Sequence, residues 1–156
     1  MKVLIADPKK CVGCRICEQW CSMKHFKVAN PDKSRITVLR SHKEYMDYPM
    51  VCRQCEERYC ISACPEKIKA LSINEETGAI KVNEENCTAC KLCIKACPNK
   101  AIKVHPTEKY VLICDLCAGA PQCANYCPEG ALYYIEQEEA QGILEAAAAS
   151  EKGDTK

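Results

Sequence analysis

Apolar residues occur along most of the chain in short alternating runs separated by polar turns, and this pattern predicts small β-ribbons. Residues 71–73 and 79–82 flank a turn that contains glycine, so we expect them to form a hairpin. Residues 102–104 and 110–113 flank a histidine–proline turn and predict a second ribbon. A further strand is expected over residues 34–40.

The pattern changes near the C-terminus, where residues 135–149 are rich in Ala, Glu and Gln and predict a helix. Residues 150–156 are expected to form a flexible tail. The helix would carry a narrow apolar stripe made of Ala140, Ile143, Leu144 and Ala147. Two interpretations of this stripe stay open. It packs against its own protein, or it docks on another subunit, for example by self-association with a second copy of the chain.

No run in the sequence approaches 18 apolar residues, so no transmembrane helix is expected. The apolar stretch at residues 3–6 is too short for a secretory signal, and a cytoplasmic location is therefore predicted. The 156-residue chain holds only one Phe and one Trp, which makes a weak apolar core for its length. Its 16 cysteines, close to one residue in ten, indicate either a disulfide scaffold or a metalloprotein.

The cysteines form four groups of four, and none is left over. The groups are Cys11-x2-Cys14-x2-Cys17-x3-Cys21, Cys52-x2-Cys55-x4-Cys60-x3-Cys64, Cys87-x2-Cys90-x2-Cys93-x3-Cys97 and Cys114-x2-Cys117-x5-Cys123-x3-Cys127. The first and third groups have the bacterial ferredoxin spacing, and the other two differ only in the gap before the third cysteine. Four thiolates ligate one four-iron cube, so the sequence predicts four [4Fe–4S] clusters. A short helix is expected between each triplet and its fourth cysteine.

Two other interpretations of the cysteines fit less well. A disulfide framework needs an oxidising compartment, and no export signal is visible. Structural zinc prefers two Cys-x2-Cys pairs separated by a dozen or more residues, which would leave the third cysteine of each triplet poorly used.

In two-cluster ferredoxins the fourth cysteine of a group ligates the other cluster, so the groups must exchange cysteines in pairs. A nested scheme pairs the second group with the third and the first with the fourth, whereas a sequential scheme pairs first with second and third with fourth. Spacing alone does not choose between the two. The nested scheme gives the clusters Cys11/Cys14/Cys17/Cys127, Cys21/Cys114/Cys117/Cys123, Cys52/Cys55/Cys60/Cys97 and Cys64/Cys87/Cys90/Cys93.

The order of these spacings, together with the Ile113–Cys117 motif ICDLC, resembles a known family. It is similar to the four-cluster ferredoxin-type electron-transfer subunits of dimethyl sulfoxide reductase, formate dehydrogenase, formate hydrogenlyase and related tungsten or molybdenum enzymes, including tungsten aldehyde oxidoreductases. The resemblance covers residues 1–135 and all sixteen ligands. One departure is that Cys21 is followed by Ser22, whereas the fourth cysteine of each other group is followed by proline.

The resemblance implies an α+β fold of two bacterial-ferredoxin-like modules related by pseudo-twofold symmetry, one inserted in the other, with nested ligand exchange. Residues 1–51 and 106–134 would form a split first module with a basic insertion at 22–51. Residues 52–105 would form the second module, followed by the C-terminal helix.

The function expected from the clusters is electron transfer. The chain would relay single electrons to or from a larger catalytic subunit, a tungsten or molybdenum pterin enzyme such as an aldehyde or formate oxidoreductase. It would have no catalytic site of its own, since neither a nucleotide loop nor a histidine–carboxylate pair is evident. The alternatives are a free soluble polyferredoxin and the electron-transfer subunit of a hydrogenase or carbon monoxide dehydrogenase. A catalytic iron–sulfur enzyme is disfavoured, because it would need a cluster held by only three cysteines.

The segment 22–51 carries six basic and three acidic residues and is either a docking face for an acidic partner or a solvated loop. Nucleic-acid binding is not expected, because no fold signature accompanies the charges. His25 and His42 are expected at the surface rather than as ligands.

Overall fold

The computed structural model describes the backbone of residues 1–151 and the side chains of residues 1–144. Within this part, strands form four two-stranded antiparallel sheets. The pairs are β1 (Lys2–Ala6) with β8 (Leu132–Glu136), β2 (Thr37–Ser41) with β3 (Met46–Met50), β4 (Leu71–Ile73) with β5 (Ile80–Val82), and β6 (Lys103–Val104) with β7 (Val111–Leu112). The protein is therefore a mixture of small sheets and short helices, in agreement with the α+β class.

A helix lies between the triplet and the fourth cysteine of every group, as predicted. These helices are α1 (Ile16–Phe26), α2 (Tyr59–Ser62), α3 (Leu92–Ala96) and α4 (Gln122–Asn125). Only α1 continues well beyond its fourth cysteine, because the Ser22 that replaces proline leaves the backbone N–H that a helix needs. The 3₁₀ turns η1 (Pro31–Lys33) and η2 (Leu116–Gly119) and the long helix α5 (Gln137–Glu151) complete the helices of the described residues.

Both predicted hairpins are confirmed, and the strand expected over 34–40 is present as β2, which begins at Thr37. The sequence did not predict β3, β1 or β8. In the β1–β8 pair Leu4 lies opposite Tyr134. The two strands are therefore distant in the sequence, and their pairing depends on tertiary packing. The predicted helix at 135–149 begins two residues late, because Ile135 and Glu136 complete β8 opposite Val3 and Lys2.

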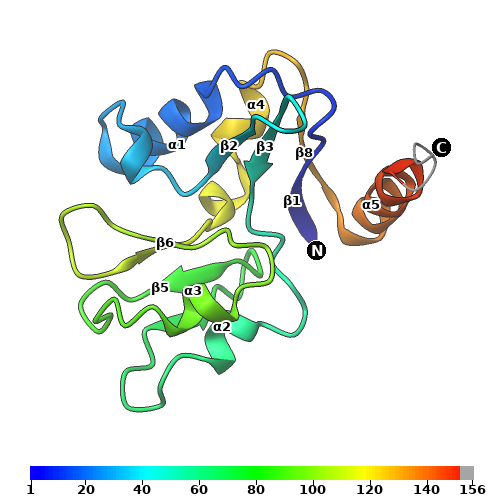
Figure 1. Ribbon diagram of the computed structural model, residues 1–156. Helices are drawn as coiled ribbons and strands as arrows, with labels where there is room; N and C mark the ends of the chain where they lie inside the picture. Colours follow the sequence, from blue (N-terminus) through cyan, green and yellow to red (C-terminus); the bar gives the residue numbers. More distant parts are fainter. Residues whose placement is uncertain (152–156) are drawn as a thin grey trace.

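Two large hydrophobic cores and one small cluster form among the described residues. The first core joins the N-terminal third of the chain to residues 116–132, includes Ala79, and surrounds Leu4, Val38 and Leu116. The second core lies within residues 52–113. Figure 1 shows this division, with α1, α4, β1 and β8 in the upper half and α2, α3 and β5 in the lower half. Cys114 packs against both cores and so marks the junction between them.

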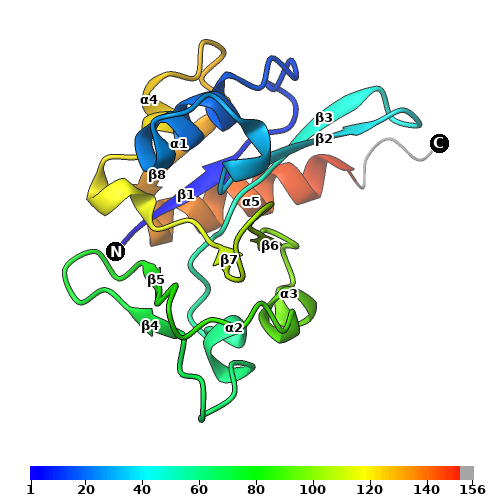
Figure 2. The same cartoon turned by 90° about the vertical axis from the view of Figure 1, so that its left-hand side faces the viewer.

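The helix α5 packs on the β1–β8 sheet. Ala140 is 2% exposed and lies against Val3 and Ile5, while Ile143 and Leu144 cover the edge of the same cluster. The first turns of the predicted apolar stripe thus pack inside the protein, whereas Ala147 lies outside the residues whose side chains are described. No helix of the described residues is both long and apolar enough to cross a bilayer. Figure 2 shows α5 running along β1, the strand that it contacts.

Candidate metal centres

All sixteen cysteines lie in the described part of the chain, and every one is a free thiol. A disulfide scaffold, the alternative considered above, is therefore absent from the structure. The thiols lie in the loops that precede α1, α2, α3 and α4 and at the ends of these helices.

Two cavities are each lined by four of these cysteines. Cys11, Cys14, Cys17 and Cys127 line the first cavity, whose remaining wall includes Val38. A second cavity is lined by Cys52, Cys55, Cys60 and Cys97. Each cavity thus combines the triplet of one group with the fourth cysteine of another group.

A third set of thiols gathers at the boundary of the two cores. Cys114, Cys117 and Cys123 are half-buried or buried, and burial raises the pKa of all three thiols. Cys21 lies close enough to each of them to raise the pKa further by electrostatic repulsion. The fourth cysteine of the first group is therefore beside the triplet of the fourth group.

The remaining four cysteines belong to the lower half of the molecule. Burial raises the pKa of Cys93 to about 11, and the neighbouring Cys87 and Cys90 contribute to this shift. Cys64 packs against the same hydrophobic core as Cys87 and Cys93. The structure thus brings cysteines together across groups one and four, and across groups two and three. The thiols that raise the pKa of Cys52 and Cys60 come from the second and third groups.

The four groups share one local backbone geometry despite their different spacings. In every group the backbone N–H of the residue after the third cysteine lies near that sulfur and lowers the pKa of the thiol. These residues are Glu18, Ile61, Ile94 and Ala124. In three groups the backbone N–H two positions after the first cysteine has the same effect on that thiol, at Gly13, Gln54 and Leu116.

The residue before the second cysteine is left-handed in all four groups. The φ angles are 69° at Gly13, 51° at Gln54, 52° at Ala89 and 57° at Leu116. Left-handed turns point backbone N–H groups into a common concavity, an arrangement that accepts anions and occurs in many iron–sulfur sites. Thiol donors in fours with inward N–H groups fit a four-iron cube, which carries thiolates and net negative charge.

Glycine at the first of these turns lets the loop lie close to the β2–β3 hairpin. A Cβ atom at position 13 would lie 2.5 Å from Oδ2 of Asp47 and 2.8 Å from Nη2 of Arg40. These two side chains form an ion pair across the β2–β3 hairpin, with Nε of Arg40 2.9 Å from Oδ1 and Nη2 3.1 Å from Oδ2 of Asp47. The loop of the first group and the hairpin are therefore in direct contact.

Burial raises the pKa of several thiols in the metal-free chain. It raises the pKa of Cys17 and of Cys52 to about 12, against an ordinary value of 9.0. A thiolate is the metal ligand, so binding of a metal group must release protons from these sites.

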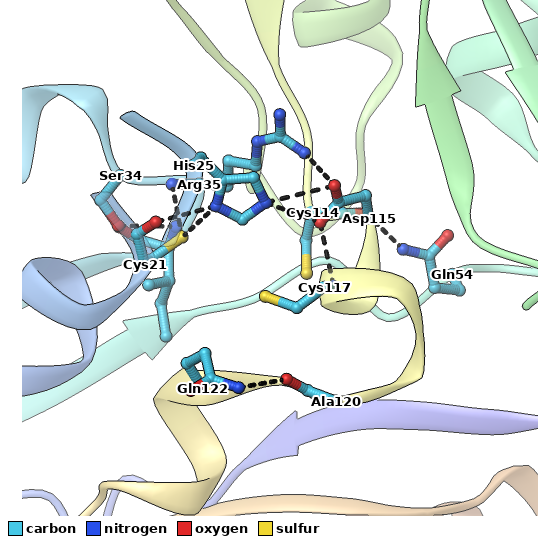
Figure 3. A network of polar contacts seen from close by, with 11 residues as sticks. Cys21, His25, Ser34, Arg35, Gln54, Cys114, Asp115, Cys117, Ala120 and Gln122 are labelled. Carbon is cyan, nitrogen blue, oxygen red and sulfur yellow. Dashed lines mark hydrogen bonds and ion pairs between the residues drawn. The ribbon is translucent and has the colours of Figure 1, made fainter. Parts of the chain in front are cut away.

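A buried ion network supports Cys21. Nε2 of His25 lies 3.0 Å from Oδ1 of Asp115, and Nδ1 lies 2.8 Å from the carbonyl oxygen of Cys21. Because a carboxylate and a carbonyl only accept hydrogen bonds, both ring nitrogens donate and His25 is an imidazolium. Arg35 forms an ion pair with the other carboxylate oxygen of Asp115. Figure 3 shows the three side chains converging between Cys21 and Cys117.

The network determines the charge state of its members. Burial would lower the pKa of His25, but its hydrogen bonds with Asp115 and Cys21 outweigh burial and raise the pKa to about 9. Burial would likewise raise the pKa of Asp115, but His25 and Arg35 hold it well below its usual range. The expectation that His25 lies at the surface was wrong, and so was the expectation that the chain lacks a histidine–carboxylate pair.

Three further hydrogen bonds reach cysteine sulfurs. The backbone N–H of Arg35 donates to Sγ of Cys21 at 3.2 Å, and that of Ala131 donates to Sγ of Cys127 at 3.3 Å. Nδ2 of Asn99 donates to Sγ of Cys55 at 3.5 Å. Such donors stabilise thiolate charge and are a principal means by which a protein sets the potential of an iron–sulfur group.

Sequence reasoning did not single out Asp115, Arg35, Asn99 or Gln54 as residues of the sites. For Asp115 and Gln54 a signal was available, since both lie inside a Cys-x2-Cys loop. Arg35 and Asn99 approach their cysteines only through the tertiary fold.

The chain resembles several known proteins. Residues 43–137 match the 4Fe-4S dicluster domain family. The polyferredoxin-like subunit of aliphatic sulfonate oxidoreductase from Pyrococcus furiosus is 42% identical over 126 residues, which cover 81% of this chain and 71% of that protein. The putative electron transport protein YsaA of Escherichia coli K12 is 35% identical over 152 residues, which cover 90% of this chain and 93% of that protein.

Among solved structures, the chain is similar to one in the active site complex BamBC of benzoyl coenzyme A reductase. The TM-score is 0.50 with 27% sequence identity, and the match covers 95% of this chain and 89% of the other.

Proposed function

Because this chain belongs to the 4Fe-4S dicluster domain family, we propose that it serves a larger oxidoreductase as the subunit that relays single electrons to or from the catalytic partner. Its cofactors are four [4Fe–4S] clusters, as predicted, and its relatives carry electrons. The observation that carries the proposal is the arrangement of sixteen free thiols in sets of four, two of which line cavities of their own.

We assign the ligands by the nested scheme. The contact of Cys21 with the fourth triplet supports it, as does the position of Cys127 beside Cys11 and of Cys97 beside Cys52. The proposed sets are Cys11/Cys14/Cys17/Cys127, Cys21/Cys114/Cys117/Cys123, Cys52/Cys55/Cys60/Cys97 and Cys64/Cys87/Cys90/Cys93. We also propose that residues 1–51 and 106–134 form one module and residues 52–105 the other. The two hydrophobic cores support a division into two halves, but Val111 and Ile113 pack in the second core and Ala79 packs in the first. Pseudo-twofold symmetry between the modules is part of the same proposal.

When bound, an iron–sulfur cluster supplies reversible uptake of one electron at a potential that its surroundings tune. The chain's own residues carry out that tuning. Backbone N–H groups at the first and third cysteines stabilise thiolate charge, and the imidazolium of His25 adds a positive charge beside Cys21. Positive charges near the sulfurs favour the reduced form of a cluster, which is the more negative form. We therefore expect the cluster held by the set that contains Cys21 to have a raised reduction potential.

The catalytic partner is proposed to be a tungsten or molybdenum enzyme such as an aldehyde or formate oxidoreductase. The relatives support the role of subunit, since one is a subunit of an oxidoreductase and a similar structure belongs to an active site complex. The resemblance of the cysteine spacings to subunits of tungsten and molybdenum enzymes supports the choice of metal.

A free polyferredoxin is the second candidate, favoured by the relative that is described only as an electron transport protein. The electron-transfer subunit of a hydrogenase or carbon monoxide dehydrogenase is a third. Both would use the same four clusters, so they differ from the first candidate in the partner alone.

Anaerobic purification of the chain from its native source tests the proposal. We expect a larger protein that contains tungsten or molybdenum to copurify in a fixed ratio, and its substrate to reduce the clusters of the complex. A chain that elutes alone and accepts electrons equally from unrelated oxidoreductases would instead support the free polyferredoxin. A partner that contains nickel would support the hydrogenase or carbon monoxide dehydrogenase.

A further inference from the structure

Gln54 is a buried polar residue at the boundary between the two hydrophobic cores. Its side chain is fully buried, with 0% exposure, although it lies in the Cys52-x2-Cys55 loop beside an exposed Arg53. Two of its side-chain hydrogen bonds reach other segments, at Cys114 and Ile80, and Figure 3 shows the bond toward Cys114. Burying an amide without partners is costly, so its contacts fix its position.

The contacts of Gln54 join cysteines from two different sets. Gln54 lies two positions after Cys52 in the loop of the second group, and its backbone N–H is near enough to lower the pKa of that thiol. Its side-chain Nε2 donates to the carbonyl oxygen of Cys114 at 2.7 Å, and Cys114 belongs to the fourth group. One residue therefore holds a proposed ligand of each module.

The side-chain oxygen of Gln54 also has hydrogen-bond partners. Oε1 of Gln54 accepts from the backbone N–H of Ile80 at 3.0 Å and from Nη1 of Arg58 at 3.1 Å. Arg58 in turn donates through Nη2 to the carbonyl oxygen of Gly78 at 2.7 Å. The acceptor and donor ends of the amide are thus both specified, and the side chain cannot rotate without losing a bond.

The loop itself does not require glutamine. The equivalent left-handed position before the second cysteine is Gly13, Ala89 or Leu116 in the other three groups. A left-handed conformation is unfavourable at any non-glycine residue, and alanine and leucine bear this cost at the equivalent positions as glutamine does here. The amide of Gln54 is therefore explained by its contact with Cys114 and not by the turn.

The thiols that Gln54 joins are also neighbours. Cys52 lies close enough to Cys114 to raise the pKa of that buried thiol by electrostatic repulsion, and Cys114 packs against both cores. An electron that moves between the modules would therefore cross here.

We propose that Gln54 is a positioning residue that holds Cys52 and Cys114 together and thereby sets the rate at which electrons pass between the two modules. This inference rests on the proposed electron-transfer function. In the step itself, one electron leaves the cluster on one side, which is oxidised by one unit, and reduces the cluster on the other side by one unit. No bond is made or broken and no proton is transferred.

Two variants test the role of the amide. Gln54→Leu removes all three side-chain bonds but installs the residue found at the equivalent position 116. Gln54→Glu keeps the acceptor for Ile80 and Arg58 but cannot donate to the carbonyl oxygen of Cys114. The matched control is Gln122→Leu, because Nε2 of Gln122 donates at 2.8 Å to the carbonyl oxygen of Ala120 within its own segment.

The measurement uses the isolated, anaerobically reconstituted full chain. Flash photoreduction followed by rapid-freeze electron paramagnetic resonance reports how fast the electron distribution between the modules relaxes, and the spin coupling between reduced clusters reports their relative position. Both Gln54 variants should keep the wild-type iron content, relax about tenfold more slowly and lose coupling across the junction, as expected when an outer-shell partner is removed. Coupling within each module, and the control variant, should match the wild type.

Full iron content with wild-type relaxation in both Gln54 variants would overturn the inference. Loss of iron in both variants would overturn it as well, since the residue would then serve cluster assembly and not electron passage. Because no catalytic partner is present, the test is independent of the partner experiment. If electrons pass between the modules of the wild-type chain but no oxidoreductase partner copurifies, the proposed subunit role is wrong and the inference on Gln54 stands.

Discussion

His25 on α1 and Asp115 in the fourth cysteine group form an ion pair, with Nε2 of the ring 3.0 Å from Oδ1 of the carboxylate. The two residues are 90 positions apart in the sequence. The pair therefore closes the upper half of the molecule, which is built from both ends of the chain, directly beside the proposed ligands Cys21 and Cys117.

Substitution of Asp115 by asparagine should destabilise this half. Asp115→Asn leaves the charged groups of His25 and Arg35 without their carboxylate, and loss of a hydrogen bond to a charged group should lower the free energy of unfolding by about 2 kcal/mol. Urea unfolding of the reconstituted protein measures this change. Asp47→Asn is the control, because its ion pair with the 57%-exposed side chain of Arg40 should contribute little. Equal loss in both variants would contradict the special role of Asp115.

Iron and sulfide analysis checks the number of clusters. Anaerobically reconstituted protein should contain about sixteen iron and sixteen sulfide per chain, four of each per cluster. Because clusters replace much of the apolar core, iron chelation should also unfold the chain, which circular dichroism would detect. About eight iron per chain after full reconstitution, or a cooperatively folded apo form, would be inconsistent with the four-cluster structure.

Nested ligation predicts that distant cysteines share a phenotype. Cys127→Ser should perturb the same paramagnetic centre as Cys14→Ser, because both thiols line one cavity. Cys97→Ser should in the same way match Cys55→Ser. Electron paramagnetic resonance of each variant identifies the affected cluster. The sequential scheme would be favoured if Cys127→Ser and Cys90→Ser changed one common centre.

Removal of α5 tests self-association through the C-terminal helix. Truncation after Glu136 keeps β8 but uncovers Val3 and Ile5, which Ala140 now covers, so the thermal midpoint should fall while iron content is retained. Light scattering should show a smaller assembly if α5 joins two copies. Truncation after Glu151 retains the whole helix and serves as the control. An unchanged mass in the shorter chain would leave α5 with an internal packing role only.

Local spacing was sufficient to predict the chemistry and the short helices, because cysteine ligation and the adjacent turns depend on residues close in sequence. The β4–β5 and β6–β7 hairpins could be predicted for the same reason. The β1–β8 pair could not, since a strand of five residues carries no information about a partner 130 positions away. The position of His25 was missed because its burial depends on Asp115, which only the fold brings near.

The pairing of β1 with β8 also bears on how the protein matures during synthesis. The buried residues of the lower core all come from residues 52–113, so we expect this half to begin folding before the rest of the chain has been translated. Under the proposed nested ligation the upper half folds later, because Cys21 would share a cluster with the triplet that begins at Cys114, and Cys11 with Cys127. We therefore expect the two clusters of the lower half to be inserted first, on the nascent chain. The two clusters of the upper half would follow only after β8 has been translated.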